Sequence, residues 1–327
     1  MIEVSIVIPC RNEEKFIRKC LNSIIEQDYP KENFEVLVVD GSSEDRSKEI
    51  VKSFSEKYSF IKLLENPQRY TPFGLNIGIK NSRGEIIARM DAHAGYEKDY
   101  ISKCVKYLKE YDADNIGGVM KTLPTADTII AKAIAVCLSH PFGAASDFRL
   151  GSKKPKLVDT VFGGCYKREV FEKIGLFNEK LIRSQDIEFN HRLKRAGGKI
   201  LLVPEIEAQY YPQSTLSGFF KHNFEDGIWT TYPLKFGIRI FSWRHLLPLT
   251  LVLGLVGLIL LSFFSQTFFL LFLLAIFGYF LISFYFSLEI AKKGKNWRYL
   301  FLMPLVFAIR HFGYGLGSIW GLIKILG

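Results

Sequence analysis

The sequence predicts an α/β fold with a mostly parallel sheet, followed by helices that cross a membrane. Over residues 1–235, short apolar runs alternate with segments whose apolar residues recur every three to four positions. This is the pattern of buried strands that alternate with amphipathic helices. Beyond them, residues 246–264 and 267–288 are nearly all apolar, and each is close to the ~20 residues that a bilayer-spanning helix needs.

The expected strands are near-continuous apolar runs, which is typical of parallel strands covered on both faces. Pro9 is expected to end the first strand, and Asn12 to cap the helix that follows it. The strands are expected at residues 4–8, 34–39, 61–64, 85–90 and 116–120. The helices are expected at residues 16–25, 72–81 and 100–111, with another that carries the apolar residues of 50–58 and a further one beginning near residue 186.

The whole chain divides into two expected parts. Residues 1–235 form a catalytic domain, and residues 236–327 hold an interfacial segment and about three membrane helices. The third apolar stretch, residues 301–326, is interrupted by Arg310 and His311, which either meet a lipid phosphate or lie at the interface. Glycines repeat every four residues at 313, 317 and 321. This repeat indicates either close helix packing, within the chain or between copies in a homo-oligomer, or a poorly formed re-entrant helix.

The formal net charge of +10 is best explained by anionic membrane lipids. Lys235, Arg239 and Arg244 precede the first apolar stretch, and four basic residues at 292–298 follow the second. The positive-inside rule then predicts a multi-pass protein of the cell membrane with both clusters in the cytosol. The run at residues 4–8 is too short for a signal peptide, which also predicts a cytosolic catalytic domain.

Other features exclude several classes of protein. No nucleic-acid recognition motif, G-x-G-x-x-G after the first strand, or G-x-x-x-x-G-K-[ST] is present in the sequence. The five cysteines are scattered without C-x-x-C spacing, which predicts reduced, mostly buried thiols. Two acids, Asp40 and Asp91, directly follow predicted strands, and the carboxyl ends of parallel strands are where such folds bind ligands.

Five segments, taken together, resemble glycosyltransferase family 2, and most closely its membrane-associated, succinoglycan-type branch, in which the usual D-x-D is often D-A-H. In order, they are VSIVIPCRNEE (4–14), VLVVDGSSEDRS (36–47), RMDAHA (89–94), FGGCYKREVFEKIGLFNE (162–179) and SQDIEFNHRLKRAGGKI (184–200). The resemblance covers roughly residues 2–235. It implies a GT-A fold, which joins a Rossmann-like nucleotide-sugar half to an acceptor-binding half.

The resemblance also implies roles for single residues at the donor site. Asp40 contacts the nucleotide base, and Pro9, Arg11 and Glu13 line the same pocket. The family often has a second acid after Asp40, where this chain has Gly41. Charge on the donor's diphosphate is then met mainly by metal, with Arg69 or Arg89 as candidate helpers. Gly163 and Gly164 either let backbone approach the sugar closely or form a plain tight turn.

The chemistry of sugar transfer requires a cation and a base. Mn²⁺ or Mg²⁺ stabilises a departing diphosphate, and we expect Asp91 and His93 to be the metal ligands, since Mn²⁺ accepts an imidazole nitrogen more readily than Mg²⁺ does. Asp186 matches the family's catalytic base. The alternatives are that Asp91 and His93 cap a turn and that Asp186 is an ordinary first-turn helix acid.

The sequence therefore predicts an inverting, metal-dependent glycosyltransferase that uses a nucleotide-sugar donor. The Q-x-x-R-W motif of processive members is missing around Trp229, which favours transfer of one sugar to a lipid-linked or saccharide acceptor. A non-catalytic nucleotide-sugar-binding membrane scaffold is the alternative. A transporter subunit is disfavoured because the first two apolar stretches lack central ionisable residues.

Overall fold

The computed structural model describes residues 2–144, 146–240 and 243–326. Contacts divide the chain into two compact units, which are Met1–Lys121 with Ser146–Tyr211, and Thr122–Ala145 with Pro212–Gly327. We call them the α/β unit and the helical unit. Residues 122–145 and 212–235 thus group with the C-terminal helices, so the compact units differ from a division after residue 235. The extent of the catalytic domain stays a prediction.

The α/β unit is built on one mixed sheet, whose strands within the described residues follow the order β3-β2-β1-β4-β8-β6-β9-β5, with β7 paired to β9. The strands are β1 (Val4–Cys10), β2 (Phe34–Asp40), β3 (Ile61–Glu65), β4 (Ile86–Arg89), β5 (Ala94–Tyr96), β6 (Asn115–Thr122), β7 (Lys156–Leu157), β8 (Cys165–Lys167) and β9 (Ile200–Tyr210).

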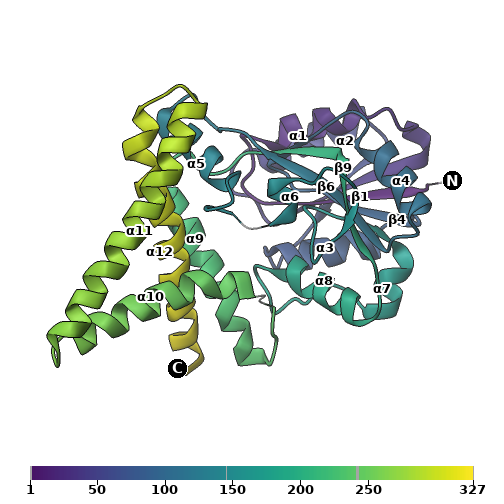
Figure 1. Cartoon of the computed structure of the whole chain (residues 1–327). Coiled ribbons are helices and arrows are strands. Elements are labelled where there is room, and N and C mark those ends of the chain that lie inside the picture. Colours follow the sequence, from purple (N-terminus) through teal and green to yellow (C-terminus); the bar gives the residue numbers. More distant parts are fainter. Residues whose placement is uncertain (1, 145, 241–242, 327) are drawn as a thin grey trace. The chain divides into compact units, whose positions relative to one another are not determined.

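The parallel half of this sheet explains the continuous apolar runs. In β1, Ile6 and Ile8 face one core while Val7 faces the other, because successive side chains of a strand point to opposite faces. Figure 1 shows α1, α2 and α4 over one face and α3, α7 and α8 over the other. The helices are α1 (Ile17–Ile25), α2 (Ser47–Lys57), α3 (Thr71–Lys80), α4 (Tyr100–Glu110), α6 (Asp147–Leu150), α7 (Arg168–Ile174) and α8 (Gln185–Arg195), with a 3₁₀ turn at Lys31–Asn33.

Two local predictions at the end of β1 are wrong. Pro9 does not end the strand, which continues to Cys10 beside β2. Pairing with β4 stops at Val7, so the N–H that proline lacks is not needed on that side. Asn12 does not cap α1, because α1 begins only at Ile17 and the Asn12 side chain accepts a hydrogen bond from the Glu44 amide at 2.8 Å.

In the second half of the sheet, only β6 matches an expected strand, the one at residues 116–120. β4 and β6 each pair antiparallel with β8, and β5 and β7 each pair antiparallel with β9. β5, β7 and β8 are only two or three residues long, too short to show a recognisable period. This antiparallel half carries residues 163–164 to the end of β4, next to Asp91.

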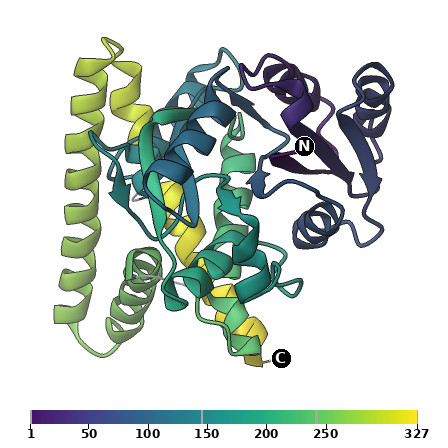
Figure 2. The ribbon, with the colours of Figure 1, turned by 90° about the vertical axis from the view of Figure 1, so that its right-hand side faces the viewer.

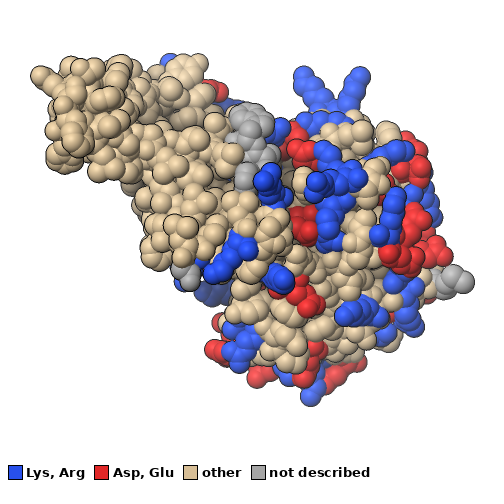
Figure 3. All heavy atoms as spheres, turned by 90° about the horizontal axis from the view of Figure 1, so that it is seen from below, with Lys and Arg blue, Asp and Glu red and all other residues tan. Residues whose placement is uncertain are grey.

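Among its described residues, the helical unit holds three helices long and apolar enough to cross a membrane, as predicted. On the face in Figure 3, charged side chains are scattered over the α/β unit and nearly absent from the apolar helices. The predicted interfacial segment contains residues 241–242, which lie outside the described residues. The helices of this unit are α5 (Ile129–Leu138), α9 (Leu216–Thr231), α10 (Trp243–Leu261), α11 (Gln266–Lys293) and α12 (Arg298–Leu326), with a 3₁₀ turn at Tyr232–Phe236.

The glycine repeat packs α12 against α9, within the chain. A Cβ at Gly317 would lie 2.0 Å from the Phe224 carbonyl oxygen, and one at Gly321 2.3 Å from the Thr231 hydroxyl. On the other side, a Cβ at Gly227 of α9 would lie 2.1 Å from the Tyr314 carbonyl oxygen. Because α12 is one continuous helix, shown with α11 in Figures 1 and 2, the re-entrant alternative is wrong for the described residues.

Arg310 and His311 of α12 bind backbone carbonyls of the segment after α5. The Arg310 Nε donates to the Gly143 carbonyl at 3.1 Å, and the His311 Nε2 lies 2.8 Å from the Phe142 carbonyl. Arg310 also donates to the side chain of Asn223, which is fully buried. These two polar residues therefore hold a connecting segment to an apolar helix.

Candidate active site

Asp40 ends β2 at the carboxyl edge of the sheet and is buried. Its carboxylate accepts hydrogen bonds from the Ser43 amide at 3.1 Å and the Ser43 hydroxyl at 2.6 Å. The Asn12 amide in turn donates to the Ser43 hydroxyl at 3.0 Å. The loops after β1 and β2 are thus joined, and residues 9–13 are held beside Asp40, as the predicted nucleotide pocket requires.

Gly41 occupies the place where the family often has a second acid, and the packing explains this difference. A Cβ at Gly41 would lie 2.8 Å from the Arg69 carbonyl oxygen and 3.3 Å from the Arg11 Cβ. A side chain here would displace the backbone at Arg69. The side chains of Arg11 and Arg69 are exposed, and the Arg69 Nη1 lies 3.8 Å from the Glu44 carboxylate.

Asp91 and Asp186 lie at one site, joined by Arg89. The Arg89 Nη2 donates to Asp91 Oδ1 at 2.7 Å, and the Arg89 Nη1 lies 3.5 Å from Asp186 Oδ2. Residue Arg89 is only 8% exposed. Burial alone would lower the pKa of Arg89, but the two carboxylates outweigh it and raise that pKa further. A charged guanidinium therefore links the predicted metal ligand to the predicted base.

Asp186 and Glu188 both lie in the first turn of α8, but only Asp186 faces this arginine. Glu188 is buried and forms an ion pair with Arg192, whose Nε donates to it at 2.6 Å. Asp186 Oδ1 accepts from the amide of Ile187 at 2.9 Å, and Ser184 just before the helix has a left-handed φ of 60°. Strained residues of this kind persist where the surrounding structure fixes them, often at functional sites.

His93 is oriented by Glu13, a pairing that the sequence did not predict. The His93 Nδ1 lies 2.9 Å from Glu13 Oε1. Burial alone would lower the pKa of His93, but the Glu13 carboxylate outweighs this effect and raises it. Because a carboxylate only accepts, Nδ1 carries the proton, and in the neutral imidazole Nε2 is left with a lone pair.

The glycines at 163 and 164 allow a close approach, but to this chain itself. They adopt φ values of 68° and 105°, and a Cβ at Gly163 would lie 2.8 Å from the Arg89 carbonyl oxygen. The Gly164 carbonyl accepts the Arg89 amide at 2.9 Å. Glycine is needed here to set the backbone of Arg89, while contact with a sugar stays a prediction.

The donor groups fit a divalent cation held partly by substrate. Among the described residues, no group of three or more His, Cys, Asp or Glu side chains is arranged to hold a metal ion. Asp91 has one carboxylate oxygen without a partner in the described structure, and His93 keeps Nε2. Mg²⁺ sites that use one or two carboxylates plus substrate phosphates need no more from the protein, and Mn²⁺ also accepts imidazole.

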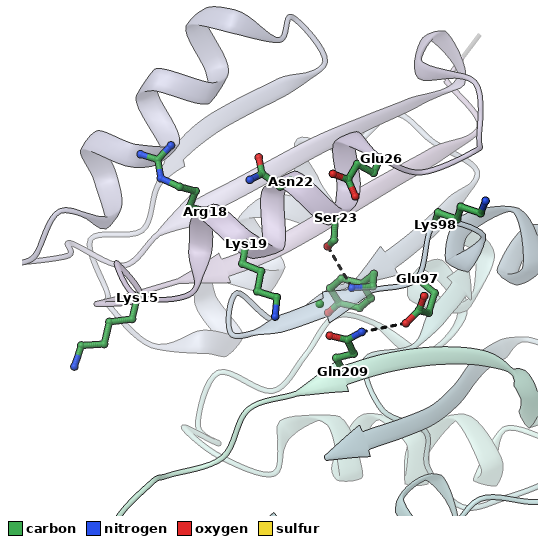
Figure 4. Close-up of a pocket in the computed structure, with 11 residues that line it drawn as sticks. Lys15, Arg18, Lys19, Asn22, Ser23, Glu26, Glu97, Lys98 and Gln209 are labelled. Atoms are coloured by element: carbon green, nitrogen blue, oxygen red, sulfur yellow. Dashed lines mark hydrogen bonds between the residues drawn. The ribbon is translucent and has the colours of Figure 1, made fainter. Parts of the chain in front are cut away.

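A separate surface groove of about 680 Å³ lies along α1 and β5. Figure 4 shows its polar lining, with Ser23 bonded to the Tyr96 amide and Gln209 bonded to Glu97. Asp40, Asp91 and Asp186 do not line it. We therefore place the candidate active site at the carboxyl edge of the sheet and not in this groove.

A Rossmann-like sheet whose carboxyl edge gathers an Asp-x-His pair and a first-turn aspartate defines a GT-A glycosyltransferase. The model of the family described as "Glycosyl transferase family 2" matches residues 5–175. This chain belongs to that family, as the five sequence segments predicted. It is a glycosyltransferase with three candidate membrane-spanning helices.

Two relatives show similarity over most of the chain. The "Dolichyl N-acetyl-alpha-D-glucosaminyl phosphate 3-beta-D-2,3-diacetamido-2,3-dideoxy-beta-D-glucuronosyltransferase" of Methanococcus voltae is 29% identical over 329 residues, which cover 98% of this chain and 97% of the relative. The "Succinoglycan biosynthesis protein ExoA" of Rhizobium meliloti is 24% identical over 267 residues, covering 74% and 80%. The second match confirms the predicted likeness to the succinoglycan branch.

A solved structure shares the fold of the whole chain. The mannosyltransferase PcManGT of Pyrobaculum calidifontis, solved in complex with GDP-Man and Mn²⁺, has a TM-score of 0.65 at 18% identity and covers 98% of this chain and 87% of that one. At this identity the match establishes the fold. The GT-A prediction is confirmed, and the single site residues stay predictions.

Proposed function

We propose that this glycosyltransferase moves one sugar, with inversion, from a nucleoside-diphosphate sugar to a lipid-linked acceptor at the cytosolic face of a membrane. The observation that carries this proposal is the single Arg89 guanidinium between Asp91 and Asp186. A metal ligand for the leaving diphosphate and a base for the acceptor must face one sugar, and these acids do lie at one site.

Each residue has one task in the proposed reaction. Asp40 and the loop of residues 9–13 hold the nucleotide, and Asp91 with His93 holds a divalent cation, which stabilises negative charge on the leaving diphosphate. The oxygen of the acceptor hydroxyl bonds to the anomeric carbon as the diphosphate leaves, and Asp186 accepts the proton of that hydroxyl. With Glu188 committed to Arg192, Asp186 acts as a base in a single displacement, which inverts the anomeric configuration.

The acceptor is proposed from the apolar helices and from the relatives. The name of the Methanococcus relative describes a dolichyl phosphate derivative, and the helical unit gives this chain its own means of residing in a membrane. Basic residues precede α10 and follow α11. The positive-inside rule therefore favours a cytosolic catalytic site. Mn²⁺ is favoured by the Asp–His donor pair and by its presence in the Pyrobaculum structure.

The proposed activity is tested with the full chain in lipid nanodiscs. UDP-, GDP- and dTDP-sugars are screened with Mn²⁺ for transfer to a sugar hydroxyl of N-acetylglucosaminyl polyprenyl phosphate, and the anomer formed is read by NMR. We expect transfer with one donor, lowered about 100- to 10,000-fold by Asp186→Asn and lowered strongly by Asp91→Asn. Glu169→Gln is the matched control, because Glu169 is a first-turn acid of α7 that is 68% exposed. Transfer at the wild-type rate in both aspartate variants would refute the assignment, and tight donor binding by the wild type without transfer would favour the scaffold.

A further inference from the structure

Arg89 is the buried centre of the candidate site. It is the last residue of β4, and its amide is fixed by the Gly164 carbonyl. Its side chain then crosses the site to two acids that come from different segments, one just after β4 and the other in α8. No other described contact joins the carboxylates of Asp91 and Asp186.

The charged partners of Arg89 distinguish it from the structural arginines of the same unit. Arg168 donates to the Gly84 carbonyl at 2.6 Å and to the Ser82 hydroxyl at 2.8 Å, so it holds a turn. Arg192 binds the carbonyls of residues 174 and 176 and a single carboxylate, that of Glu188 in its own helix. In Arg89, each terminal nitrogen contacts one of the two site acids, and the Nε is buried without a partner in the described structure.

We infer that Arg89 is a positioning residue, which fixes the base Asp186 relative to the metal ligand Asp91. This inference rests on the proposed function. Two carboxylates at one site repel each other, and a guanidinium between them holds both while leaving each with oxygen lone pairs for substrate. The base that accepts the proton of the acceptor hydroxyl is then held at a fixed position relative to the departing diphosphate.

The planar shape of the guanidinium is essential to this role. Its two terminal nitrogens point in different directions and reach two partners at once. A lysine ammonium is a single point charge on a shorter side chain. Lysine at position 89 therefore keeps the positive charge but contacts one acid at a time. Arg89→Lys therefore separates the geometry of the bridge from its charge.

The test compares wild type, Arg89→Lys and the structural control Arg168→Lys in nanodiscs. We expect Arg89→Lys to lower kcat about 100-fold, because a displacement near 1 Å can cost that much. The KM for the donor and the Kd of Mn²⁺ with nucleoside diphosphate, measured by calorimetry, should change less than about threefold. Arg168→Lys should leave kcat unchanged.

A double variant tests whether Arg89 acts through Asp186. If it does, Arg89→Lys should add little to the loss caused by Asp186→Asn, since residues that act as a unit are not additive. Fully additive losses, an unchanged kcat in Arg89→Lys, or a parallel fall in kcat and nucleotide affinity would each overturn the inference. The last result would also be the outcome for a destabilised variant. Absence of transfer by the wild type would instead overturn the proposed function.

Discussion

The packing of α12 on α9 allows a worked prediction for Gly317→Ala. The new Cβ would lie 2.0 Å from the Phe224 carbonyl oxygen, and ordinary contact begins at 3.4 Å, so the helices must separate by about 1.4 Å. Such overpacking costs about 1–3 kcal/mol. The separation also lengthens the hydrogen bond from the Thr231 hydroxyl to the Ser318 carbonyl, now 2.7 Å, worth about 1 kcal/mol. Alanine regains about 1 kcal/mol of helix propensity, which leaves a net loss of about 2 kcal/mol.

The matched control is Gly257→Ala in α10, where an added Cβ meets nothing within 4 Å. In Gly257→Ala, only the gain in helix propensity changes the free energy of unfolding, so the control should be neutral or slightly stabilising. Thermal unfolding in the same detergent, followed by intrinsic fluorescence, measures both variants, and a loss of 2 kcal/mol corresponds to a melting temperature lower by roughly 4–8 °C. Equal melting temperatures for the two variants would show that the glycine face of α12 is not packed on α9.

Two further predictions concern the α/β unit. Burial opposes the ionisation of Glu35, but its hydrogen bonds with Arg83 and other partners lower its pKa. Glu35→Gln should cost about 1–3 kcal/mol at neutral pH. Because the folded pKa is lowered, that difference should be complete above about pH 5 and shrink as the pH falls below 4, as thermal unfolding across this range would reveal. Gly41→Asp, which restores the family's second acid, should lower the melting temperature and weaken binding of nucleoside diphosphate in calorimetry, because its Cβ meets the Arg69 carbonyl. Gly41→Ala should also lower the melting temperature. Tighter binding of nucleoside diphosphate by Gly41→Asp would contradict this reasoning.

The parallel half of the sheet was predictable because its strands carry their own evidence. Residues 34–39 are buried on both faces, so each position is apolar or fixed by a specific partner, and the run stands out from the amphipathic helices around it. The antiparallel half lacks such evidence. β8 is three residues long and pairs with both β4 and β6. Its position depends on contacts between distant segments, which periodicity does not encode.

The candidate site was predicted in part for the same reason. Asp40 and Asp91 directly follow apolar strands, and that position alone places them at the sheet's carboxyl edge. The bridge by Arg89 was missed because the two acids are 95 positions apart in the chain, and side-chain direction decides which of them an arginine meets. One signal was available, since a charged residue as the last member of an apolar strand needs a buried partner of opposite charge.

The pairing of Glu13 with His93 explains how an Asp-x-His segment can serve where the family usually has Asp-x-Asp. The usual motif places two carboxylates at one strand end. Here the imidazole occupies the second position, and a carboxylate from the loop after β1 stands directly behind it. With Asp91 and His93 as the proposed metal ligands, the site would keep the two acids of Asp-x-Asp, while one ligand atom would change from oxygen to nitrogen. A second-layer carboxylate also fixes the imidazole and makes it a stronger ligand. On this proposal the second acid stands one side chain further from the cation, and the imidazole ligand would favour Mn²⁺ over Mg²⁺.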